Sequence, residues 1–182
     1  MTRRGQDVGG RRGSLRKLLA VSGGIVIASL AGGAVAGGAI DSDRPPGFSV
    51  TTIDGKAFTL SAQRGKVVVF DFLQAGCSSC AEQVPVLSRS ASRFASKRVE
   101  VLVLDVSGES ASALRSYYRG TLRASKRLLV AADKSFRVAQ RYRVIAVGMT
   151  YVVGRDGRVH WQGLWLGKEN VLLGAIRQAA AV

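Results

Sequence analysis

Residues 66–85, K-V-V-V-F-D-F-L-Q-A-G-C-S-S-C-A-E-Q-V-P, decide the fold. An apolar, β-branched run typical of a buried strand leads through a turn of small residues to Cys77 and Cys80, where a helix-like segment begins. A helix N-terminus has unpaired N–H groups and a partial positive charge, and both stabilise a thiolate. We therefore expect Cys77 to ionise more readily than a free cysteine.

Cys77 and Cys80 are the only cysteines in the chain, and their spacing permits a disulfide that stores two electrons. A structural disulfide over so short a loop would constrain the unfolded chain little. A zinc site requires about four ligands, whereas the sequence offers one histidine, His160. Because C-x-x-C near a βαβ pattern is typical of thioredoxin-like redox motifs, the pattern favours a redox pair. Metal binding and an inert pair are the alternatives.

The 182 residues suffice for one domain of ordinary size and a tail, and their formal net charge is +15. Residues 1–40 carry six Lys/Arg and one Asp, and residues 41–182 carry 21 Lys/Arg and 11 Asp/Glu. A basic chain suits nucleic acid, anionic lipid or an acidic protein. The sequence has no nucleic-acid motif, so we expect no nucleic-acid binding and interpret most of these charges as a solvated surface.

Four segments follow from composition. Residues 1–17 are basic and predicted to be disordered, residues 18–40 lack charge, residues 41–47 form a linker, and residues 48–182 form the folded domain. A helix of 23 residues would cross a hydrocarbon core, and the preceding Lys/Arg cluster predicts a cytoplasmic N-terminus. Residues 18–40 are therefore either a single-pass anchor or a cleaved signal with a small-residue site at 34–36. Both interpretations place the domain outside the cytoplasm.

The domain is predicted to alternate strands and helices. A hairpin turns at Asp54-Gly55, and Asp133 is expected to cap a helix that ends near residue 142. The expected strands after the hairpin are 66–73, 99–106, 127–131, 149–153 and 158–162, and the expected helices are 78–97, 109–119, 133–142 and 168–180. This order predicts an α/β fold with a central mixed sheet and helices on both faces.

The chain resembles the thioredoxin superfamily, and in particular its extracytoplasmic TlpA-like thiol–disulfide oxidoreductases. The resemblance covers about residues 48–182 and rests on F-x-x-x-x-x-D-G-K-x-F-x-L, R-G-K-V-V-V-F-D-F, C-S-S-C followed by E-x-x-P, and G-M-T-Y-V-V-G-R-D-G-R-V. It implies a thioredoxin-like three-layer fold with an N-terminal β-hairpin extension and an N-terminal hydrophobic helix. It also implies a protein-disulfide reductase without a bound cofactor or metal.

The resemblance assigns roles to four residues. Cys77 matches the attacking cysteine and Cys80 the resolving cysteine, Asp71 matches the buried acid beneath the disulfide, and Pro85 matches the helix-kinking proline. Burial would raise the pKa of Asp71 and allow it to accept the proton that Cys80 loses. The alternative is a strand-end carboxylate in solvent.

The loop before the strand at 149–153 differs from the family, which has a cis-proline before the threonine. Met149 stands at that position, and Thr150 follows it. Cys77, Cys80 and Met149 together form a soft ligand set suited to Cu(I), so a Sco-like copper chaperone is an alternative function. A redox-inactive binding module is the second alternative. Trp161 and Trp165 are predicted to be packing residues.

The predicted function is disulfide exchange with partner proteins, in the direction of reduction, at the cell membrane or in secreted form. The expected partners are protein substrates with thiols or disulfides, an upstream dithiol donor or oxidant, and the membrane through the N-terminal helix. In TlpA-like relatives the reaction sometimes serves cytochrome c maturation.

Overall fold

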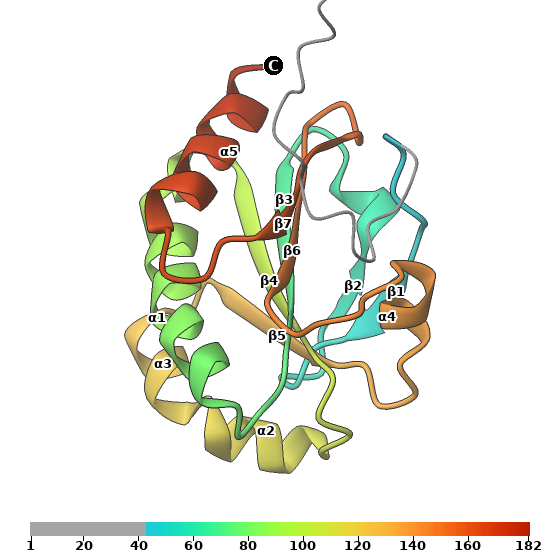
Figure 1. Cartoon of the computed structure of the whole chain (residues 1–182), viewed down its shortest axis with the longest axis vertical. Coiled ribbons are helices and arrows are strands. Elements are labelled where there is room, and N and C mark those ends of the chain that lie inside the picture. Colours follow the sequence, from blue (N-terminus) through green and yellow to red (C-terminus); the bar gives the residue numbers. More distant parts are fainter. Residues whose placement is uncertain (1–42) are drawn as a thin grey trace, which may run out of the picture. The chain divides into compact units, whose positions relative to one another are not determined.

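The computed structural model describes residues 43–182, in which short loops connect alternating strands and helices (Figure 1). The segments expected at 1–17 and 18–40 lie outside these residues. The elements in chain order are β1 (Ser49–Thr51), β2 (Ala57–Thr59), the 3-10 helix η1 (Leu60–Gln63), β3 (Val67–Leu73), α1 (Ser78–Arg93), the 3-10 helix η2 (Ala95–Lys97), β4 (Val99–Asp105), α2 (Ala111–Tyr117), α3 (Arg119–Ala124), β5 (Leu128–Ala132), α4 (Arg137–Arg141), β6 (Met149–Val153), β7 (Val159–Leu164) and α5 (Glu169–Ala181).

Five strands form the central sheet in the order β5-β4-β3-β6-β7. β3, β4 and β5 are parallel, whereas β6 runs antiparallel to β3 and β7 antiparallel to β6. β1 and β2 form a separate antiparallel pair, linked to β5 by an isolated bridge between Thr52 and Ala131. The three parallel strands therefore begin at one edge of the sheet and end at the other.

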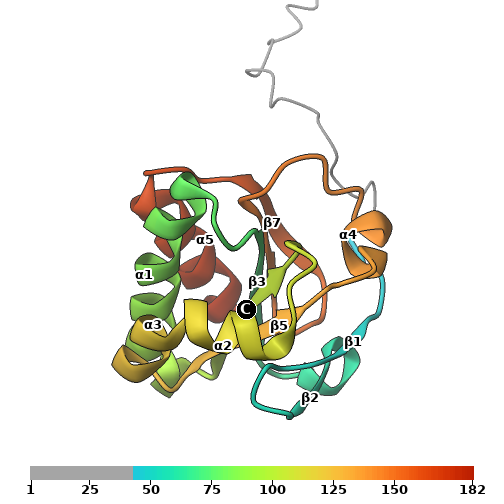
Figure 2. The ribbon, with the colours of Figure 1, turned by 90° about the horizontal axis from the view of Figure 1, so that it is seen from below.

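The sheet is covered on both faces, which explains why every residue of β3 is buried. Alternate residues of β3 point to opposite faces. Val67, Val69 and Leu73 join a core cluster with α1, α2 and α5. Val68, Phe70 and Phe72 join a second cluster with α4 and the β1–β2 pair. Figure 2 shows α1, α3 and α5 on one side of the sheet and α4 on the other.

This architecture confirms the predicted central mixed sheet flanked by helices, although several local predictions were wrong. The helix expected from residue 133 begins only at Arg137, after Phe136 in the left-handed region at φ 54°. Asp133 is not its N-cap; the Asp133 carboxylate instead accepts a hydrogen bond of 2.8 Å from the Ala139 N–H. Helix α3 and the 3-10 helix at residues 60–63 were not predicted.

Across residues 43–182, each helix is too short or too polar to span a lipid bilayer.

Candidate active site

Cys77 and Cys80 form a disulfide at the start of α1. Cys77 is the N-cap residue of the helix, and its Sγ accepts a hydrogen bond of 3.2 Å from the Cys80 N–H. The Ser79 Oγ lies 3.3 Å from the same sulfur. Cys77 is partly exposed, whereas Cys80 is only 2% exposed. The helix N-terminus therefore surrounds the accessible sulfur with donors that would stabilise a negative charge.

The turn before Cys77 is held by Asp105, a buried acid at the end of β4. Its Oδ2 accepts hydrogen bonds from the Ala75 N–H at 3.0 Å and from the Tyr118 hydroxyl at 2.8 Å. Its Oδ1 accepts from the Ser107 N–H at 2.9 Å. Burial, together with the neighbouring Asp105 charge, raises the pKa of Tyr118. Asp105 was not predicted as a site residue, although an acid at the end of the strand beside β3 is a usable signal.

Asp71 lies on β3 with its side chain on the face covered by α1, the helix that carries the cysteines. It is fully buried, and its Oδ2 accepts a hydrogen bond of 2.7 Å from the Thr150 hydroxyl. Its Oδ1 is buried without a hydrogen-bond partner among the described residues. Burial raises the pKa of Asp71 to about 7, although the Thr150 and Trp165 hydrogen bonds act in the opposite direction. This burial agrees with the interpretation of Asp71 as an internal acid rather than a solvated strand-end carboxylate.

Trp165 is the second side chain that reaches Asp71. It is 1% exposed in the loop between β7 and α5. Its Nε1–H points at two acceptors, the Thr150 Oγ1 at 2.9 Å and the Asp71 Oδ2 at 3.3 Å. The sequence predicted only a packing role for this residue, because a contact across 94 positions leaves no local signal. Trp165 and Thr150 together stabilise the ionised form of Asp71.

A cavity of about 340 Å³ opens beside the cysteines. Gln83 contributes to its lining, and although it is only 2% exposed, its Oε1 has no hydrogen-bond partner among residues 43–182. The Gln83 amide lies against Gly148, whose φ is +87°; a Cβ at Gly148 would come within 2.9 Å of the Gln83 Nε2. The cavity is lined by Ser79, Glu82, Gln83, Val86, Trp165, Leu166, Gly167 and Glu169.

The remaining predicted site residues fall into two groups. Thr150 joins Asp71, and Pro85 lies inside α1. Met149, by contrast, packs in the core cluster on the sheet face opposite to that of Cys80. The structure therefore places the Met149 and Cys80 side chains in different core clusters, an arrangement that does not favour the copper alternative.

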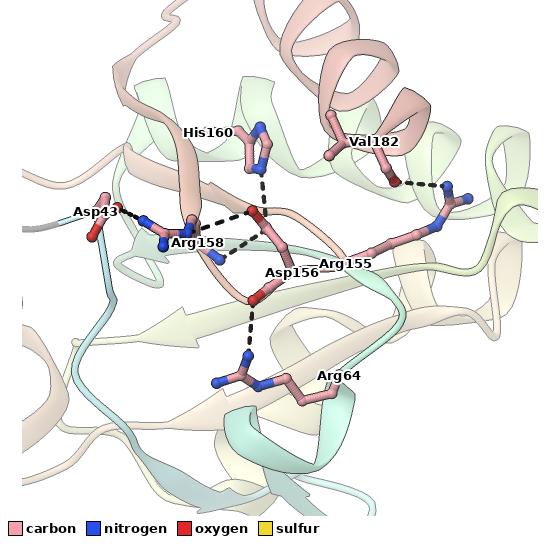
Figure 3. A network of polar contacts seen from close by, with 7 residues as sticks. All are labelled: Asp43, Arg64, Arg155, Asp156, Arg158, His160 and Val182. Atoms are coloured by element: carbon pink, nitrogen blue, oxygen red, sulfur yellow. Dashed lines mark hydrogen bonds and ion pairs between the residues drawn. The ribbon is translucent and has the colours of Figure 1, made fainter.

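His160 also lies away from the cysteines. Figure 3 shows it in the β6–β7 hairpin, where its Nε2 is 3.1 Å from the Asp156 Oδ1. Val153, at the end of β6, pairs with Val68 at the beginning of β3, whereas the cysteines follow the end of β3. Within the described part of the chain, no group of three or more His, Cys, Asp or Glu side chains is placed to hold a metal ion.

Known proteins with a similar sequence carry names that agree with this chemistry. The thiol-disulfide oxidoreductase ResA of Bacillus thuringiensis subsp. konkukian is 27% identical over 114 residues, which are 63% of this chain and 64% of ResA. The chain thus spans less than two thirds of the length of that relative.

Solved structures share the fold. A thiol:disulfide interchange protein from Chlorobium tepidum superposes with a TM-score of 0.65 at 18% identity, covering 78% of this chain and 98% of that one. The exposed lipoprotein thioredoxin Etrx1 of Streptococcus pneumoniae superposes with a TM-score of 0.63 at 23% identity, covering 73% of this chain and 99% of Etrx1. These likenesses establish a thioredoxin-like fold. The sequence profile of the AhpC/TSA family matches residues 42–162, and the chain belongs to that family.

Proposed function

We propose that this protein is an extracytoplasmic thiol–disulfide oxidoreductase that reduces disulfides of partner proteins with the Cys77–Cys80 pair. The observation that carries the proposal is the unequal placement of the two cysteines. Cys77 is partly exposed and its Sγ accepts a hydrogen bond from the Cys80 N–H, whereas Cys80 is buried. The name of the ResA relative supports the same chemistry. The uncharged residues 18–40, preceded by six Lys/Arg, support a location outside the cytoplasm.

The first step begins with the reduced pair. The Cys77 thiolate attacks one sulfur of the partner disulfide, so that a mixed disulfide forms and the other partner sulfur leaves as a thiolate. The helix N-terminus stabilises the attacking thiolate, because the Cys80 N–H already points at the Cys77 Sγ. The exposure of Cys77 allows the partner to reach it.

The second step releases the reduced partner. The Cys80 thiol loses its proton, its sulfur attacks the Cys77 Sγ, the internal disulfide forms, and the partner sulfur leaves as a thiolate that takes up a proton. Asp71 is the base for this step, directly or through water, since it is internal and its pKa is raised to about 7 by burial. An upstream dithiol donor then returns the pair to the reduced state.

The proposal is tested with the purified full chain and a disulfide-bonded model peptide. The reduced wild-type chain should reduce the peptide, Cys77→Ser should not react, and Cys80→Ser should accumulate the mixed disulfide, which mass spectrometry detects. A wild-type chain that does not exchange with the peptide or with oxidised glutathione would instead indicate a redox-inactive binding module.

Asp71→Asn tests the proton acceptor separately. This variant should slow the resolution of the mixed disulfide and leave its formation unchanged, because only resolution requires deprotonation of Cys80. Stopped-flow measurement of the two steps checks the assignment. Equal slowing of both steps would assign Asp71 a structural role only.

A further inference from the structure

The edge of the sheet opposite the disulfide carries a concentration of positive charge. Four segments meet there: residues 64–66, 97–98, 126–127 and 155–158, each of which contributes two Lys or Arg side chains. The first three precede the parallel strands β3, β4 and β5, and the fourth is the β6–β7 turn. We call these four segments the basic edge. β3 has seven residues, so this edge lies roughly 20 Å from the loop that carries Cys77.

The four segments form one continuous surface. The Gly65 N–H donates to the Arg155 carbonyl at 3.1 Å, and the Arg155 guanidinium donates to the Lys97 carbonyl at 3.2 Å. A groove of about 330 Å³ joins the starts of β3, β4 and β5, and Lys66, Arg98 and Arg127 are among its lining residues.

Part of this charge is neutralised within the domain. Glu100 pairs with Lys66 at 2.9 Å, and Arg158 pairs with Asp43 and with Asp156. Among residues 43–182, however, Lys97, Arg98 and the adjacent pair at 126–127 make no ion pair, and all four side chains are exposed. The edge that carries the cysteines has a mixed charge instead. Its segments contain acidic residues at 82, 109 and 169 and basic residues at 134, 143 and 168.

The described chain begins at the basic edge. Asp43 forms an ion pair with Arg158, and its carbonyl accepts a hydrogen bond of 2.6 Å from the Val159 N–H (Figure 3). Only two residues, Asp41 and Ser42, lie between Asp43 and Ile40, the last residue of the uncharged stretch. The three extended steps from Ile40 to Asp43 reach about 10 Å, which is close to the Debye length of about 8 Å at physiological ionic strength.

We propose that the basic edge binds an anionic lipid surface and thereby holds the domain with the Cys77–Cys80 edge directed away from the membrane. The inference rests on the membrane tether that is part of the proposed function. A lipid surface fits better than a single small anion, because the cations spread over four exposed segments instead of converging on one buried donor. The short tether brings the basic edge near the membrane, and the added attraction holds it there in one orientation that presents Cys77 to soluble partners.

The experiment uses the full chain in nanodiscs that contain a paramagnetic headgroup lipid, with phosphatidylglycerol as the anionic lipid and phosphatidylcholine alone as the neutral control. In anionic discs, amide NMR signals of residues 97–98, 126–127 and 155–158 should broaden strongly, and those of residues 77–80 should not. This difference should shrink in neutral discs and at 0.5 M salt, because a lipid surface attracts cations electrostatically.

A charge-reversal variant and a matched control complete the test. Lys126→Glu combined with Arg127→Glu should lower the lipid-facing population at least about fivefold, the factor that one Lys or Arg near an anionic surface contributes. Lys134→Glu combined with Arg137→Glu makes the same charge change at the other edge and should leave the pattern unchanged. Identical broadening in anionic and neutral discs, or equal effects of the two variants, would overturn the proposal.

The two proposals fail independently. Disulfide exchange measured in detergent micelles should be the same for the Lys126→Glu, Arg127→Glu chain and for the wild type, because these residues lie far from the cysteines. Normal exchange together with no lipid-dependent orientation would refute the membrane-facing edge and leave the oxidoreductase intact. No exchange in the wild type would refute the oxidoreductase.

Discussion

Replacement of Asp71 by Asn should change how the stability of the domain depends on pH. Burial raises the pKa of Asp71 from 3.8 to about 7 in the folded protein. Between these two values the folded state holds a proton that the unfolded chain has released, so the free energy of unfolding falls as pH rises. The stabilising contribution is complete below about pH 4 and is lost as pH passes through about 7.

The size of the effect follows from the same shift. Each pH unit between the two pKa values changes the free energy of unfolding by about 1.4 kcal/mol. From pH 5 to pH 8 the wild-type domain should therefore lose roughly 3 kcal/mol through Asp71, a loss that Asp71→Asn should not show. Urea unfolding of the oxidised 43–182 domain, followed by circular dichroism at both pH values, measures the difference.

The comparison has an internal reference, because contributions of groups other than residue 71 cancel when the wild type and the variant are subtracted. Asp105→Asn is the matched control, because the Asp105 oxygens already accept hydrogen bonds from Ala75, Ser107 and Tyr118. That control should lower stability by about 1–3 kcal/mol at both pH values. Parallel losses in the wild type and Asp71→Asn would show that Asp71 ionises like an ordinary carboxyl group.

Three further predictions follow from neighbouring contacts. Trp165→Phe removes an N–H that stabilises ionised Asp71, so the pH midpoint for resolution of the mixed disulfide should rise by about half to one unit. Stopped-flow pH profiles test this, and a midpoint equal to that of Trp161→Phe would contradict it. Gln83→Met removes a buried acceptor without a partner, so urea unfolding should show a loss no larger than about 1 kcal/mol; a larger loss would mean that the amide is satisfied. Met149→Leu should leave the Cu(I) affinity of the reduced chain unchanged in a competition titration, since its thioether packs away from the cysteines; weaker binding would restore the copper alternative.

The central strands could be predicted because burial on both faces demands a continuous apolar sequence. The prediction of 66–73 differs from the observed β3 by one residue, and 149–153 coincides with β6. Helix α3 was missed because its sequence, R-G-T-L-R-A, has no apolar stripe and none of its residues is buried. The start of α4 was misplaced because Asp133 reaches the Ala139 N–H from several residues before the helix, a contact that a local N-cap pattern does not describe.

The site was predictable where its residues are close in sequence. Asp71 lies on β3 and the cysteine pair lies at the start of the helix that follows it, and the resemblance supplied Thr150. Trp165 and Asp105 act through contacts between distant segments, and periodicity contains no information about such pairs. The face on which Met149 packs follows from alternation along β6, whose odd positions face the second core cluster.

The close approach of Gly148 to Gln83 links two positions that are 65 residues apart in the chain. Any side chain at 148 would collide with the amide at 83, and the backbone there already adopts a conformation that favours glycine. A shorter side chain at position 83 would relieve the collision but not the torsional penalty. A larger residue at position 148 would therefore also require a different backbone conformation of the loop. A substitution at 148 is therefore strained by its backbone conformation whichever residue occupies position 83.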